Sequence, residues 1–256
     1  MVCKLRMGFI IFLTGLVLNR PCLAQQTEPY VNPSENINPD PNYVPGDYVM
    51  PDTNQSRIVY ETAKAELANL AVGLDSQTAT TLGLGEIKFR SIKNETAEVL
   101  GYFRHYFGLV RFKDGEFGTL DMVVDINSLD TGVPGRNNRV LDILLQSAVP
   151  ELGVVKIHFE EFRIEGGESS LGALQPGKSY AASASGSLVL NGRTLPVQAV
   201  LSVVKKENGW VVETTAQIPV RLSDLGYGAR VYDLMRSCNH KSISDTVEIG
   251  VKLYFS

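Results

Sequence analysis

The sequence predicts an all-β protein, an antiparallel β-barrel of about eight strands with one or two short helices. Apolar residues recur at every second position over many segments, as they do in strands with one buried face. The pairs Asp114-Gly115, Asn191-Gly192 and Asn208-Gly209 separate such segments and are typical of tight hairpin turns. Helices and strands do not alternate, which argues against a parallel sheet. Closing this meander into a barrel would remove its exposed edges, and a sandwich is the alternative.

Residues 1–24 have the features of a secretion signal. Lys4 and Arg6 give a positively charged start, the apolar stretch MGFIIFLTGLVL follows, and Cys22-Leu23-Ala24 is typical of a cleavage site before Gln25. The apolar stretch is shorter than a stable membrane span, so no stable membrane insertion is expected. A lipoprotein signal lipidated at Cys22 and an uncleaved anchor are the alternatives. We therefore expect a periplasmic or secreted protein.

Charge and cysteine content narrow the possible functions. The chain has 24 basic and 28 acidic residues; residues 1–24 hold three of the basic ones and no acid, so the remainder has a net charge of −7. The chain has an excess of acidic residues and no basic patch of the kind that binds nucleic acid, so no nucleic-acid partner is expected. Only Cys238 lies outside the predicted signal, which excludes a disulfide within the mature chain. Stability must then come from the core, and about 230 residues suffice for one.

Residues 25–56 are expected to form a leader rich in proline and asparagine, ahead of a barrel domain at residues 57–256. Apolar residues are too sparse in the leader to build a core. It could be a flexible tether or a strap along the barrel surface. Its prolines are Pro29, Pro33, Pro39, Pro41, Pro45 and Pro51.

Residues 57–84 combine two patterns. Val59, Ala63 and Leu67 have helical spacing, whereas the residues from Leu70 to Leu74 alternate as in a strand. We predict a short helix followed by the first strand.

Strands are predicted from residue 85 onward, and the clearest covers residues 115–127. One side of this strand is apolar and is expected to be dry, and the other is polar and is expected to be wet. The apolar side carries Leu120, Met122, Val124 and Ile126, and the polar side carries Asp121, Asp125 and Asn127. A polar corner and an apolar helix at about residues 138–149 follow, which suggests a cap over one end of a barrel.

The second half of the chain continues the strand pattern. The apolar phase slips by one residue at Glu160-Glu161, which predicts a β-bulge within a strand that ends near residue 164. Two hairpin turns then predict three consecutive antiparallel strands over residues 182–218. Residues 222–244 are expected to be irregular with a possible helical turn, and residues 247–255 to form the closing strand.

Cys238 and His240 form the most specific chemical pattern in the chain. A thiol and an imidazole could bind a soft metal or act as a nucleophile and base. The favoured interpretation is a packing cysteine and a loop histidine, because no second cysteine or paired histidine supports a site. No catalytic residue, metal site or cofactor is therefore predicted, and the protein is not expected to be an enzyme.

The inward faces of the predicted strands mix small and large apolar residues, which could leave an elongated void. Such a void suits a polyprenyl or acyl chain, because apolar burial contributes about 0.8 kcal/mol per methylene. Alternatively, the small residues simply accommodate the large ones. The residues expected to line the cavity are Phe89, Phe103, Met122, Val124, Phe159, Ala182, Ala184, Gly186, Leu188 and Ala199. Asp130, Arg136 and Arg139 could form an ion-pair network that fixes the corner, or could receive a polar head group.

Three segments, in the same order, resemble the YceI-like family of lipid-binding, lipocalin-like proteins. They are VVDINSLDTG followed by Arg136 and Arg139, GSLVLNGRTLPVQAVLSV at residues 186–203, and IPVRLSDLGYG at residues 218–228. The resemblance covers roughly residues 85–256 and implies a lipocalin-like barrel that binds a polyisoprenoid or quinone-like lipid. A membrane protein is a possible donor or acceptor of that lipid. The alternatives are a filled barrel that acts as an interaction module, and a redox or metal accessory protein that uses Cys238 and His240.

The exported chain is expected to begin near Gln25, because cleavage after Ala24 fits the pattern of small residues. N-terminal sequencing of the exported protein tests this expectation. A diacylated N-terminus at Cys22 would contradict it and identify a lipoprotein.

Overall fold

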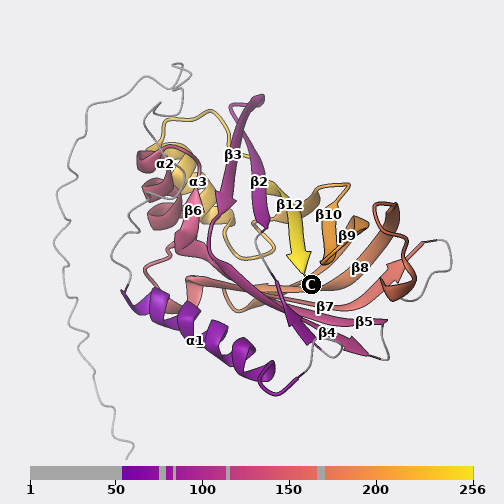
Figure 1. The fold of residues 1–256 in the computed structure, drawn as a ribbon. Helices are drawn as coiled ribbons and strands as arrows, with labels where there is room; N and C mark the ends of the chain where they lie inside the picture. The colour runs from indigo at the N-terminus through magenta and orange to yellow at the C-terminus, as the bar shows by residue number, and fades with distance from the viewer. Residues whose placement is uncertain (1–53, 75–78, 83–84, 114–115, 166–170, 256) are drawn as a thin grey trace, which may run out of the picture.

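The computed structural model describes residues 54–74, 79–82, 85–113, 116–165 and 171–255 (Figure 1). The predicted signal and all but the last residues of the predicted leader lie outside the described residues. No described helix is both long and apolar enough to cross a membrane.

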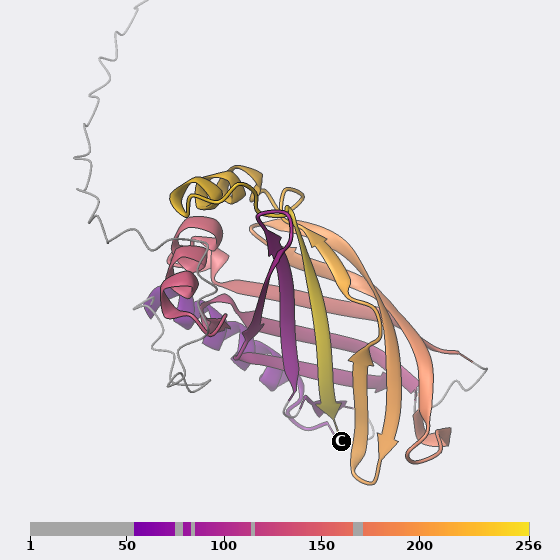
Figure 2. The same cartoon turned by 90° about the horizontal axis from the view of Figure 1, so that it is seen from above.

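The described chain forms one strongly curled antiparallel sheet (Figures 1 and 2). Its strands are β1 (Ala79–Thr81), β2 (Glu86–Lys93), β3 (Ala97–Phe103), β4 (Tyr106–Lys113), β5 (Glu116–Asp125), β6 (Leu129–Asp130), β7 (Val154–Ile164), β8 (Ser179–Leu190), β9 (Arg193–Lys206), β10 (Gly209–Thr214), β11 (Ile218–Arg221) and β12 (Thr246–Phe255). Their order is β1-β4-β5-β7-β8-β9-β10-β12-β2-β3-β6, and β11 pairs with β12. The predicted all-β class is confirmed. The strands outnumber the predicted eight because several are very short.

An isolated bridge brings distant parts of the sheet together. Leu82, directly after β1, pairs with Phe255 of β12, which is the eighth strand in the order that begins with β1. The sheet therefore curls far enough for its first strand to meet a later one, as in a barrel.

Both predicted turns of the second half are present, although the second lies at Glu207-Asn208, one residue earlier than predicted. Asn191 and Gly192 join β8 to β9 with φ values of 55° and 66°, as a type I′ turn requires. Gly209 begins β10 with a φ of 115°, directly after the second hairpin turn. The bulge is confirmed as well, because the register of β7 against β8 shifts between Phe159 and Glu161. The strand expected to continue to Ile218 is instead interrupted between β10 and β11.

Helix α1 (Asn54–Leu70) lies on the outside of the sheet, across β4, β5 and β7 (Figure 1). A short helix followed by the first strand was expected within residues 57–84, and both are present, but the strand is β1 at Ala79–Thr81 and not the alternating residues 70–74. Residues 71–73 form a turn, and Leu70, Val72 and Leu74 are exposed without a pairing strand. Their alternation was too short to indicate a strand by itself.

The alternation predicted that the outer face of β5 is exposed to water, and this prediction is wrong, because the face is largely buried. Val123 packs against Tyr60 and Ala63 of α1 and is 3% exposed, as is Val124 on the inner face. Asp125 and Asn127 are buried too, and the Asp125 carboxylate accepts the Asn127 backbone N–H at 2.9 Å. A period of two identifies the two faces of a strand, but it does not show what covers the polar one.

Helices cover one end of the curled sheet (Figures 1 and 2). They are α2 (Pro134–Arg139), which continues into the π-helix η2 (Val140–Leu145), and α3 (Gly228–Ser237). The helix formed by α2 and η2 begins and ends four residues earlier than predicted. Helix α3 is a full helix where an irregular segment with a possible helical turn was expected. Leu141, Leu144, Val231 and Leu234 pack into the same core as the strands, so the predicted cap is present.

Replacing Val123 by Asp should destabilise the fold by about 3 kcal/mol or more, because an uncompensated carboxylate would be buried under α1. Val200→Asp is the matched control, since Val200 is exposed on β9 and its replacement should cost less than about 1 kcal/mol. Urea unfolding of both variants measures the difference. Equal, small effects would contradict the packing of α1 on the sheet.

Candidate functional site

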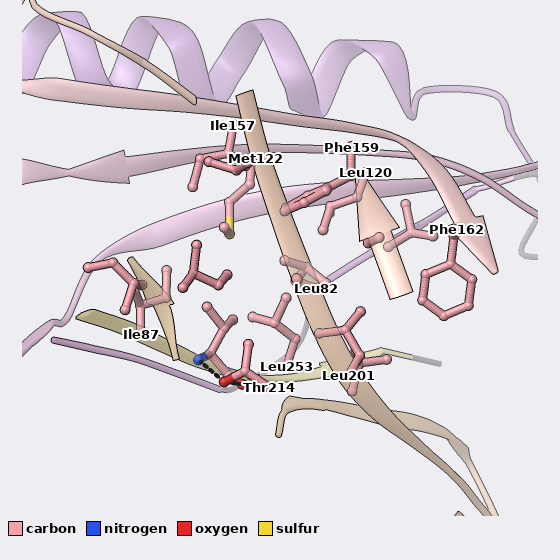
Figure 3. A pocket seen from close by; sticks show the side chains of 18 of the residues that line it. Leu82, Ile87, Leu120, Met122, Ile157, Phe159, Phe162, Leu201, Thr214 and Leu253 are labelled. Atoms are coloured by element: carbon pink, nitrogen blue, oxygen red, sulfur yellow. Dashed lines mark hydrogen bonds between the residues drawn. The ribbon is translucent and has the colours of Figure 1, made fainter. Parts of the chain in front are cut away.

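The inside of the curled sheet holds an apolar cavity of about 90 Å³ (Figure 3). Strands from all around the sheet contribute to its wall. The lining residues are Leu82, Ile87, Val110, Phe117, Leu120, Met122, Ile157, Phe159, Phe162, Ala184, Leu188, Val197, Ala199, Leu201, Val212, Thr214, Ile218, Val220, Ile249, Val251, Leu253 and Phe255. Thr214 carries the one hydroxyl in this set, and it accepts the Val251 backbone N–H at 3.0 Å. The wall therefore presents no free hydrogen-bonding group to a ligand and favours apolar chains.

Half of the residues predicted to line the cavity do so. Met122, Phe159, Ala184, Leu188 and Ala199 all belong to the wall, and they come from β5, β7, β8 and β9. Their inward direction follows from the alternation seen in the sequence.

The other five predicted residues are not part of the cavity wall. Phe89 and Phe103 pack against each other, with ring centroids 5.6 Å apart. Val124 and Ala182 are buried in the surrounding core. Gly186 lies against the bulge of β7, where a Cβ would come within 2.0 Å of the His158 carbonyl oxygen. The inward face of the sheet is longer than the cavity, so alternation alone selected more residues than line it.

Several lining residues were not selected from the sequence. Most of these belong to strands whose alternation was visible, such as Val212 of β10 and Leu253 of β12. The missing information was which strands lie opposite one another, and that depends on the strand order. Leu82 carried no signal, because it lies outside any predicted strand.

Aromatic side chains gather where the strands end away from α2 and α3. The rings of Phe117 and Phe162 are 4.5 Å apart, and those of Trp210 and Phe255 are 5.6 Å apart. The Trp210 indole N–H donates to the Leu171 carbonyl at 3.3 Å, which holds the short helix η4 (Leu171–Ala173) over this end. Phe117, Phe162 and Phe255 also line the cavity, so these rings form its wall at this end.

The predicted corner residues do not form one network. The Asp130 carboxylate pairs with Arg104, whose Nη2 and Nε lie 2.8 and 3.0 Å from Oδ2. The Asn137 side-chain oxygen instead holds the corner by accepting the Thr131 backbone N–H at 2.8 Å and the Thr131 hydroxyl at 2.6 Å. Among the described residues, no ion pair joins Asp130 to Arg136 or Arg139.

The charges of Arg136 and Arg139 act on His240, which was weighed with Cys238 as a thiol and imidazole site. Burial lowers the pKa of Arg136. Burial also lowers the pKa of Lys93, and the positive charge of Arg136 lowers it further. The pKa of His240 is lowered mainly by burial and then by the positive charges of Lys93, Arg136 and Arg139. Within the described residues, no group of three or more His, Cys, Asp or Glu side chains is arranged to hold a metal.

A hollow of about 320 Å³ lies between α1 and the outer face of the sheet. Its wall includes Leu67 and Leu70 of α1, and Asp121 and His158 of the sheet. The His158 Nδ1 atom lies 2.7 Å from Asp121 Oδ1, and Arg111 binds the other carboxylate oxygen. Asp121 thus interacts with both Arg111 and His158 on the outer face of the sheet.

The fold and the cavity can be compared with known proteins. A family model for the YceI-like domain matches residues 62–255. A polyisoprenoid binding domain from Saccharophagus degradans, implicated in plant cell wall breakdown, has a TM-score of 0.60 and 21% identity, covering 70% of this chain and 98% of that chain. BcnA from Burkholderia cenocepacia has a TM-score of 0.51 and 16% identity, covering 66% of this chain and 95% of that chain.

At these identities the two structures share the fold with this chain. No curated protein matches the sequence. The family model covers most of the chain and begins before the three segments that carried the resemblance. The chain belongs to the YceI-like family.

Proposed function

We propose that the protein is exported and binds a long apolar lipid inside the barrel without catalysing a reaction. The observation that carries this proposal is the composition of the cavity wall. Among its lining residues a single hydroxyl occurs, and it is hydrogen-bonded to the backbone. A hydrocarbon chain needs no polar partner, whereas a polar ligand in this wall would lose its hydration without compensation.

The cavity must widen to take a long chain. Its volume of about 90 Å³ is smaller than the roughly 300–1,000 Å³ of typical ligand pockets. Met122 and several phenylalanines form the wall, and their side chains can change rotamer to admit a chain. Each methylene that enters contributes about 0.8 kcal/mol, which offsets the cost of such rearrangement.

The comparisons support an isoprenoid-like ligand. The solved domain from Saccharophagus degradans is described as polyisoprenoid binding, and this chain shares its fold. A quinone-like lipid with an isoprenoid tail belongs to the same class. The predicted signal supports export, and a membrane protein as donor or acceptor would follow from the need to move such a lipid through water.

A redox or metal accessory role is the second candidate. Cys238 and His240 would supply the thiol and the imidazole for such a role. The thiol also packs against the core and is half-buried, as a structural cysteine would be.

Ala184→Phe should remove lipid from the purified protein with little loss of stability, because the ring would occupy the cavity. Ala182→Phe is the matched control. Ala182 is fully buried two residues away and does not line the cavity, so overpacking there should cost about 1–3 kcal/mol.

Native mass spectrometry and solvent extraction of protein from its own host measure the lipid, and thermal melts of delipidated protein measure stability. Equal destabilisation by both substitutions, with no lipid in the unsubstituted protein, would indicate a filled barrel that acts as an interaction module.

Cys238→Ser should leave lipid content unchanged and alter stability only slightly, because the thiol has no disulfide partner in the described chain. Loss of a bound metal or of a measurable redox reaction in this variant would establish the second candidate instead.

A further inference from the structure

The hollow between α1 and the outer face of the sheet is larger than the cavity inside the barrel. Its volume of about 320 Å³ lies within the range of roughly 300–1,000 Å³ that is typical of small-molecule sites. Helix α1 runs along the outer side of β4, β5 and β7 (Figure 1), and the hollow lies between this helix and residues of β5, β7 and β8. It is therefore on the opposite side of the sheet from the proposed lipid site.

Most of the residues that line this hollow are apolar. Leu67 and Leu70 line it from α1, and Val123 and Val189 line it from β5 and β8. Val123 is buried under the helix, whereas Leu70 is 52% exposed. An apolar group that covers Leu70 removes this surface from water, which is favourable.

Three polar residues lie side by side on the sheet wall of the hollow. Asp121 of β5 pairs with His158 of β7, which in turn pairs with Ser187 of β8. Both oxygens of the Asp121 carboxylate are already bound, one by Arg111 and the other by His158 Nδ1 at 2.7 Å. Because a carboxylate only accepts, Nδ1 carries the proton of the neutral imidazole, and Nε2 is an acceptor. This Nε2 atom lies 3.8 Å from Glu160, beyond hydrogen-bond distance, and Ser187 adds a hydroxyl beside it.

Two side chains of opposite charge lie on opposite walls. Glu66 belongs to α1 and Lys156 to β7, and both are exposed. Within the part of the chain that the structure describes, neither has an oppositely charged group within 4.0 Å. The hollow thus holds an anion and a cation apart, with apolar residues in the same walls.

We propose that this hollow binds a small zwitterion with an apolar body, of the class formed by apolar amino acids and short apolar peptides. The ammonium group of the ligand pairs with Glu66 and its carboxylate with Lys156, while its side chains cover Leu70. A ligand with a single charge would pair with one wall and be repelled by the other. His158 and Ser187 supply hydrogen bonds to the peptide group. Exposed ion pairs contribute little energy, so the apolar contact provides affinity and the two charges select the ligand.

Calorimetric titration of the full chain with the dipeptide leucylleucine at low ionic strength tests the site, because each charge of this probe can be removed separately. N-acetyl-leucylleucine lacks the ammonium group, and leucylleucine amide lacks the carboxylate. Each should bind at least about threefold more weakly than the free dipeptide. The advantage over the acetylated peptide should disappear in Glu66→Gln, and the advantage over the amide in Lys156→Gln. Both residues are exposed, so neither substitution should change the thermal melt.

Leu70→Ser should weaken binding of leucylleucine about fivefold or more, because it removes apolar contact. Val200→Ser is the matched control, since Val200 is also 52% exposed but lies on β9 and does not line the hollow. Absence of binding to the unsubstituted chain up to roughly 10 mM, equal binding of the three peptides, or an equal loss in the control would overturn the proposal.

Ala184→Phe separates this site from the proposed lipid site, because Ala184 lines the inner cavity and not the hollow. This variant should bind leucylleucine as the unsubstituted chain does. Loss of dipeptide binding in Ala184→Phe but not in Leu70→Ser would place the dipeptide inside the barrel and overturn the outer site. Lipid extraction reports on the inner cavity alone, so failure of either site leaves the other testable.

Discussion

The fold depends on β5 being buried on both faces. Val123 and Val124 are neighbours in the chain, point to opposite sides of the strand, and are equally inaccessible to water. The inner face belongs to the main core that surrounds the cavity, and the outer face to a smaller core under α1. Because a strand alternates strictly, a shift of one residue in its pairing would exchange the two sets of side chains. The register of β5 therefore determines which of its side chains line the cavity and which pack against α1.

Much of the fold could be predicted from the sequence, because turns and bulges are determined by a few neighbouring residues. The hairpin at Asn191-Gly192 and the bulge beside Glu161 depend on a few neighbouring residues, and both are present. Covering of the outer face by α1 could not be predicted in the same way. Asp125 looked solvent-exposed by its alternation, but its burial depends on a helix that precedes it by more than fifty residues.

In the candidate site, too, features set by neighbouring residues were predicted correctly and features set by distant strands were not. Ala184 and Ala199 were correctly expected to face inward, and they are directly paired across β8 and β9 in the cavity wall. Phe89 was expected to join them but packs against Phe103 instead. Which inward residues meet the void depends on where opposite strands diverge, and a single strand's pattern contains no information on that separation.

Side chains and helices cover the two ends of the cavity, and this has a consequence for the timing of ligand exchange. Rings such as Phe117 and Phe162 form one end, and the leucines of η2 and α3 fill the other. A bound chain cannot leave until one of these packed groups separates. Its residence time is then determined by the rate of local opening and not by affinity alone. If the proposed lipid occupies the cavity, its release requires such an opening, and a surface that separates these packed groups would speed it.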